Sequence, residues 1–244
     1  NTITLNQSGN NFTGAVSLNT SGSKNASIVD TNGLVLGAST VGGTFTATAD
    51  NISGSGLVTA PTVDLNATTG ITANLAASTI SADSTTGLVS LANALGTAVT
   101  VSSLTSTGDA TTNPSSGVLI QFSQSGGGAV TFNNVSSVGS ANTGNKNYGI
   151  ISLSNSAGEI IVDGSGVSSE FESDISISTS GSGNNITVNA PINAVLNGGG
   201  VHLISSGSIS ATGQITGYAG DIQAQTGISI TDGNLSQGFN NISS

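Results

Sequence analysis

The chain has 244 residues, of which only 6% are charged and 3% are aromatic, and it contains no Cys, Met or Trp. So few large side chains argue against a single thick core, and a formal net charge of −10 with two basic residues argues against binding to nucleic acid or to an anionic membrane surface. No run approaches the roughly 20 apolar residues of a membrane span, so the sequence predicts no membrane insertion.

Alternation of apolar and polar residues predicts short strands along the whole chain. Within residues 43–49, Phe45 and Ala47 are expected to point inward, and Thr44, Thr46 and Thr48 are expected to point outward. The next outward set is Thr62, Asp64 and Asn66, so we interpret these rows as a wet outer face and not as a repeating ice-binding ladder. The same alternation predicts further inward residues: Val63, Leu65, Val118, Ile120, Phe122, Val130, Phe132, Ile175, Ile177, Ile186 and Val188.

Corners and loops are indicated by composition. Pairs of Thr, Asp or Asn with Gly predict tight turns at residues 69–70, 163–164, 197–200 and 232–233. Two stretches, 108–117 and 138–148, lack alternation. They are predicted to leave the main body as longer loops, where repeat proteins tend to place binding functions.

A repeat near the C-terminus sets the expected fold class. Four inward residues each recur after about 20 residues, in the pairs Val201 and Ile222, Leu203 and Ala224, Ile209 and Ile230, Ile215 and Leu235. A period of roughly 20 residues with strands and Gly or Asn corners predicts an all-β parallel β-helix, or β-solenoid. We expect one solenoid segment over residues 1–244, with about a dozen rungs at ~4.8 Å and a length of about 55 Å.

Several segments resemble the rod repeats of filamentous haemagglutinin-like bacterial exoproteins. They are Gly9–Leu18, Ile28–Gly37, Gly43–Ala49, Asn185–Asn193 and Gly200–Leu203. The resemblance implies a right-handed parallel β-helix in a large bacterial surface protein, usually exported by a two-partner route. It therefore implies a secreted, extracellular location at the cell surface. The secretion-signal domain that begins such proteins is not recognisable in this sequence.

The most acidic spot suggests a metal site. Glu170, Glu172 and Asp174 alternate with apolar residues, so a strand would place their carboxylates in one row, about 7 Å apart. Three carboxylates can bind Ca²⁺. The interpretation we prefer is a solvated face that discourages lateral aggregation, because the Gly-Asp nonapeptide of calcium-binding repeat toxins is absent.

A carbohydrate-active β-helix, such as a polysaccharide depolymerase or a tailspike-like protein, is the alternative function. Paired carboxylates for glycoside hydrolysis could come from Glu159 with Asp163 or from Glu170 with Glu172. The chain has no Arg or Trp to support such a site, and its one histidine, His202, is expected to be an ordinary surface residue. We therefore expect no catalysis and no cofactor.

The expected function is structural and adhesive: a segment of an extracellular bacterial filament or adhesin shaft. Residues Asn1–Leu5 and Gly238–Ser244 resemble interior rungs, and an uncovered rung exposes unpaired backbone groups. We therefore expect the partners to be adjoining repeats or other copies, stacked end to end. Surface glycans or host receptors are the further partners considered.

Overall fold

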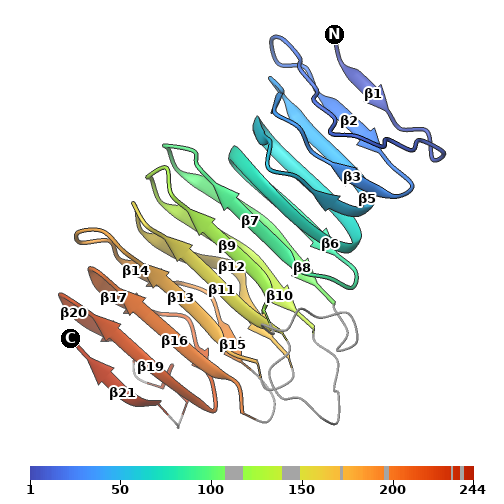
Figure 1. Ribbon diagram of the computed structural model, residues 1–244. Coiled ribbons are helices and arrows are strands. Elements are labelled where there is room, and N and C mark those ends of the chain that lie inside the picture. The colour runs from blue at the N-terminus through green and yellow to red at the C-terminus, as the bar shows by residue number, and fades with distance from the viewer. Residues whose placement is uncertain (108–117, 139–148, 171–172, 195–197, 232, 237–238) are drawn as a thin grey trace.

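The protein is a stack of parallel strands. The computed structural model describes residues 1–107, 118–138, 149–170, 173–194, 198–231, 233–236 and 239–244. In these residues the chain forms 21 strands of one sheet and no helix, and the paired strands are parallel. Figure 1 shows the strands layered along a rod whose two ends carry the two termini. The predicted all-β parallel β-solenoid is confirmed.

One face of the rod runs from β3 (Gly33–Val35) to β21 (Phe239–Ser243). Its strands pair in chain order: β3, the end of β5 (Thr44–Ser53), part of β6 (Leu57–Ser84), β7 (Val89–Asn93), β9 (Val118–Gln124), β11 (Ile150–Asn155), β13 (Ile175–Thr179), β16 (Gly200–Ser205), β19 (Ala219–Ala224) and β21.

Two further faces come from strands that bend. Three strands contribute their first half to one of these faces and their second half to the other: β8 (Val99–Ser106), β10 (Val130–Ser137) and β12 (Ile160–Ser169). β14 (Ile186–Val188), β17 (Ser208–Ala211) and β20 (Gly227–Ile230) continue the first halves, and β15 (Ile192–Ala194) and β18 (Ile215–Thr216) continue the second. At the other end lie β1 (Ile3–Leu5), β2 (Ala26–Val29), the start of β5, and β4 (Ser39–Thr40), which pairs with the start of β6.

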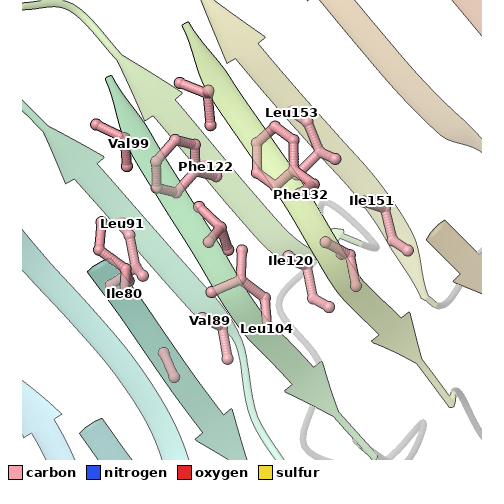
Figure 2. Close-up of a cluster of buried hydrophobic side chains, with 14 of the residues drawn as sticks. Ile80, Val89, Leu91, Val99, Leu104, Ile120, Phe122, Phe132, Ile151 and Leu153 are labelled. Atoms are coloured by element: carbon pink, nitrogen blue, oxygen red, sulfur yellow. The ribbon is translucent and has the colours of Figure 1, made fainter. Parts of the chain in front are cut away.

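The interior is one continuous cluster of aliphatic side chains with a few phenylalanines. Phe45 and Ala47 are buried as predicted, and Thr44 and Thr46 are partly exposed on the outside. Phe122 of β9 and Phe132 of β10 meet edge to face, with ring centroids 5.3 Å apart. Figure 2 shows these two rings among aliphatic residues from neighbouring strands. Each layer is thus thin, and its burial depends on the layers above and below.

The predicted register of the C-terminal repeat is wrong in three of its four pairs. Leu203 lies against Ile222 and not against Ala224, and Ile209 lies against Ile228 and not against Ile230. Val201 is likewise displaced, since it lies against Gly220. The bridge between Ile215 and Leu235 agrees with the prediction. A slip of two positions keeps every side chain on the same face, so alternation alone cannot distinguish the two registers.

Rung length also varies more than the sequence suggests. Phe45 pairs with Val63 and Val201 pairs with Gly220, so the rungs towards both ends are short. In the middle, Val89 pairs with Ile120, and Ile120 pairs with Ile151. Each of these rungs therefore contains more than one and a half times as many residues as a rung near either end. The longer rungs contain the two predicted loops. Residues 108–117 and 139–148 lie outside the described residues, and Val138 continues the ladder by donating its N–H to the Ser106 carbonyl.

The inward prediction fails at one residue. Val118 is partly exposed and Leu119 is buried in its place, while Ile120 and Phe122 are buried as predicted. Val118 pairs with Ile150, and Ile120 pairs with Ile151, so β9 carries one extra residue at this point. Such a bulge reverses the alternation locally, because two residues of one strand oppose one residue of its partner.

Two columns of buried polar residues run through the interior. The first column lies at the ends of the first-face strands and consists of Asn93, Gln124, Asn155, Thr179 and Ser205. The second lies at the ends of the bent strands and consists of Ser84, Ser106, Ser137 and Ser169. They bond to turns: Asn155 Nδ2 donates to the Gly128 carbonyl at 2.9 Å, and Ser106 Oγ donates to the Gly87 carbonyl at 2.7 Å. The interior side chains thereby satisfy backbone groups that the corners leave unpaired.

Candidate functional site

The outer surface carries a groove of about 370 Å³ that crosses four successive passes of the chain. Its lining comes from β5, from two passes of β6 and from the end of β8, with Thr107 just beyond it. These strands lie in neighbouring layers in Figure 1. Register fixes the groove's walls: Thr48 lies beside Asn66, and Asp83 lies beside Thr105.

Small residues explain why the surface is hollowed at this place. Ala49, Ala67 and Ser84 are buried at the base of the groove. Ala49 pairs with Ala67, and the next pass follows closely because Thr85 N–H donates to the Ala67 carbonyl at 3.0 Å. Three consecutive layers therefore carry side chains of only one or two heavy atoms at this place, and the taller Thr, Asn and Asp side chains beside them form the rims.

Some polar groups of the groove are already engaged. Asp83 Oδ1 accepts hydrogen bonds from Ser103 Oγ at 3.1 Å and from Thr105 Oγ1 at 2.5 Å. Asn66 Nδ2 donates to Asp64 Oδ1 at 3.3 Å, and Thr107 Oγ1 donates to the Thr85 carbonyl. These contacts fix the Asp83 carboxylate but leave its second oxygen, Oδ2, without a partner in the described part of the protein.

Three hydroxyls of the groove remain free. The side chains of Thr48, Thr68 and Thr85 are exposed and make no hydrogen bond with the part of the chain that the structure describes. Each hydroxyl can donate one hydrogen bond and accept others. Among the described lining residues only Asp83 is acidic, and none is basic. The described lining therefore offers hydrogen-bonding groups and one carboxylate among small apolar groups, and it lacks the groups that attract an anion.

The predicted calcium residues are only partly described. Glu170 follows β12 and Asp174 precedes β13, so neither lies in a strand, and the regular row expected for them does not hold at these two positions. Asp174 Oδ1 accepts the Gly200 N–H at 2.7 Å, and Ser173 between them is buried. Glu172 lies outside the described residues, so a calcium site at Glu170, Glu172 and Asp174 stays a prediction.

The other candidate carboxylate pair is widely spaced. Glu159 immediately precedes β12 and Asp163 lies four residues further along the extended chain, which separates their backbones by about 13 Å. Glycoside hydrolysis uses carboxylates that are roughly 5 to 9.5 Å apart. Asp163 Oδ1 instead accepts the N–H of Gly164 at the corner, at 2.9 Å. The second pair, Glu170 with Glu172, again includes a residue outside the described ones.

His202 points outward, as its alternation predicts. Its Nδ1 lies 3.5 Å from Asp221 Oδ2, and the two residues are directly paired between β16 and β19. Both side chains are more than a third exposed, so water screens the pair. In the described part of the chain, no group of three or more His, Cys, Asp or Glu is arranged to hold a metal ion.

Sequence reasoning did not find the groove. Thr48 and Asn66 were interpreted only as members of a wet outer face, and the structure places them side by side there. The available signal was the recurrence of small residues at Ala49, Ala67 and Ser84, after intervals of 18 and 17 residues. The meaning of that recurrence is clear only once the short rungs of this region are known.

Comparison with protein-family models, with curated proteins and with solved structures found no match for this chain. The described residues contain no helix that is long and apolar enough to cross a membrane.

Proposed function

We propose that this chain is a structural and adhesive segment of an extracellular bacterial surface filament or adhesin shaft. The observation that supports the proposal best is the unbroken stack of parallel rungs with one continuous apolar interior. Such a stack is stiff along its axis, because each layer is bonded to both neighbours, and it can be lengthened by adding rungs.

The outer surface suits this role. Strands of the first face present mainly Ser, Thr, Asn and Gln outward, such as Ser152 of β11 and Ser176 of β13, which are adjacent in register. The sides of the rod thus carry mainly small uncharged residues, and the whole chain has a net charge of −10, so side-by-side aggregation of rods is disfavoured. The resemblance to haemagglutinin-like rod repeats, noted in the sequence, supports secretion to the bacterial surface as part of the same proposal.

Further rungs are the proposed partners at both ends. The inward residues of the terminal layers, Ile3 and Leu5 at one end and Ile228 and Ile230 at the other, are only partly buried. Ile242 of β21 is half-exposed. A neighbouring repeat or another copy would bury these residues and pair the open strand edges, at a spacing of ~4.8 Å.

Antibodies provide the test of location. Antibodies raised against the purified chain should label intact cells of the organism that encodes it, and protease added outside the cells should remove the label. An internal protein of the same cells serves as the control for cell integrity. Labelling that appears only after the cells are permeabilised would refute a surface shaft.

Sedimentation at different salt concentrations tests the partners. If copies stack end to end, association should increase as salt screens the repulsion between acidic chains, and the assemblies should stay thin in electron micrographs. Ile242→Ser at the exposed edge should weaken association, whereas Ser152→Ala on the rod's side should not. A chain that stays monomeric at high concentration and high salt would contradict stacking between copies.

A further inference from the structure

We propose that the groove over β5, β6 and β8 binds an uncharged carbohydrate chain lying along the rod axis. This inference rests on the proposed adhesive function and gives it a ligand class and a place. The groove crosses four layers, so its length is about 14 Å at ~4.8 Å per layer, and its volume of about 370 Å³ suits a ligand of a few sugar units.

The polarity of the lining selects the ligand class. Pockets for drug-like molecules are lined mostly by apolar and aromatic residues. Here the rims consist of Thr, Asn and Asp, and the apolar contribution comes from the two alanines at the base and from the methyl groups of the Thr side chains, with no aromatic or large aliphatic residue among the described lining residues. A sugar chain carries hydroxyl groups on every unit, and these can both donate and accept hydrogen bonds. It therefore matches a row of free Thr hydroxyls better than an apolar ligand does.

Each free group has a defined part in this proposal. The hydroxyls of Thr68 and Thr85 lie on consecutive passes of the chain, on one rim of the groove, and can bond to consecutive positions of one ligand. Thr48 is in register with Asn66, so its hydroxyl lies on the opposite rim. Asp83 Oδ2 would accept a sugar hydroxyl, while its Oδ1 stays bonded to Ser103 and Thr105. A charge-assisted bond of this kind is stronger than a neutral one and would fix the orientation of the ligand.

Charge excludes the acidic glycans. No described residue of the lining is basic, Asp83 contributes a carboxylate, and Asp64 lies next to Asn66 through its hydrogen bond. A sulfate or carboxylate group placed in the groove would meet carboxylates without a counter-charge. We therefore expect neutral oligosaccharides to bind and sulfated or uronic-acid oligosaccharides not to bind.

The first experiment screens the purified chain against neutral, sulfated and uronic-acid oligosaccharides immobilised on one array. Titration calorimetry with a neutral hexasaccharide from the array then compares three proteins. They are the wild type, the double variant Thr68→Val with Thr85→Val, and the control Thr212→Val. Thr212 is likewise exposed, and its hydroxyl makes no hydrogen bond in the described part of the chain, but it lies on the rod between β17 and β18. Val keeps the branched shape of Thr, so the strands and the melting temperature should be retained in both variants.

The double variant should bind the neutral oligosaccharide about tenfold more weakly, because two hydrogen bonds are lost, and Thr212→Val should bind like the wild type. Three results would overturn the proposal: no neutral oligosaccharide binds at millimolar concentration, the two variants lose affinity equally, or only acidic glycans bind. Surface labelling with antibodies is independent of these results. A surface chain that binds no sugar would refute the groove's role and leave the shaft proposal standing.

Discussion

Phe45 and Thr46 are neighbours in β5 that occupy opposite environments. The Phe45 side chain is 1% exposed within the apolar interior, and Thr46 lies on the outer face directly beside Asp64 of the next layer. In so thin a layer the interior offers no partner for a charge. Burial of an unpaired carboxylate therefore costs much more at residue 45 than a polar change costs at residue 46.

Phe45→Asp should lower the free energy of unfolding by more than about 3 to 5 kcal/mol, which is the usual loss for truncation of a buried Phe. Thr46→Asn should change it by less than about 0.5 kcal/mol. Asn is the better control than Asp, because an Asp at residue 46 would face Asp64 in register. Thermal and urea unfolding followed by circular dichroism would measure both. Equal losses would contradict the assignment of inward and outward faces.

A substitution at Asn155 would test whether the buried polar residues stabilise the turns. Its Nδ2 donates to the carbonyls of Gly128 and Glu159, and its Oδ1 accepts the Ala157 N–H at 3.1 Å. Asn155→Leu keeps the volume but leaves turn groups unpaired, so we expect a loss of about 1 to 3 kcal/mol in denaturant unfolding. Ser152→Ala on the outer face of the same strand is the control and should be nearly neutral. A Leu variant as stable as the wild type would show that Asn155 does not hold the turn.

These polar columns also mark the limit of prediction at the residue scale. Alternation placed Val130, Phe132, Ile175 and Ile177 inward correctly, because their chemistry and their position agree. Asn155, a buried residue, has the chemistry of an outer residue or a turn residue, so the sequence did not indicate its place. Only the turn groups that it bonds to explain why it points inward.

At the scale of strands, register depends on corners more than on the strands themselves. Gly87 lies in a corner between β6 and β7, where its N–H donates to Ser84 Oγ at 3.1 Å and its carbonyl accepts Ser106 Oγ. A methyl group at this position would overlap the Thr69 carbonyl of the preceding layer. The corner is therefore closed by the close approach of two backbones, which only Gly permits.

Gly87→Ala should cost about 1 to 3 kcal/mol of stability, because the layers must separate locally. Gly14→Ala is the matched control: a methyl group there meets nothing within 4 Å, and it should leave the stability unchanged or raise it slightly. Differential scanning calorimetry of the two variants would decide. Equal melting temperatures would mean that the corner at Gly87 is looser than described.

The strand scale also shows which parts of the fold alternation cannot specify. The steps from Phe45 to Val63 and from Leu203 to Ile222 are set by the corners that the chain makes between them. A corner that is shorter or longer by two positions leaves the pattern of faces unchanged. The sequence therefore predicted the class of fold and most faces, but it placed three of the four C-terminal pairs two positions out of register.

At the scale of the whole molecule, the groove could not be predicted for the same reason. Ala49, Ala67 and Ser84 are far apart in the sequence, and they form one base only because the short rungs of this region stack them. If these rungs were as long as those in the middle of the rod, the three residues would not lie beside one another. Architecture was thus accessible from composition and periodicity, whereas the site required the register of each layer.

The stacked register can be measured directly, because the chain contains no Cys. Ser152 and Ser176 both point outward and are paired between β11 and β13, so their Cα atoms should be about 4.8 Å apart, within the range of a disulfide. Ser178 lies two positions further along, at about 8 Å from Ser152, beyond that range.

The decisive measurement is therefore the rate of disulfide formation in dilute, mildly oxidised protein, followed by mass spectrometry and non-reducing electrophoresis. The variant Ser152→Cys with Ser176→Cys should form an intramolecular disulfide readily and without loss of the strand signal in circular dichroism. The variant Ser152→Cys with Ser178→Cys should keep its thiols free. Oxidation of the second variant as fast as the first, or of the second alone, would contradict the parallel stack on which this account depends.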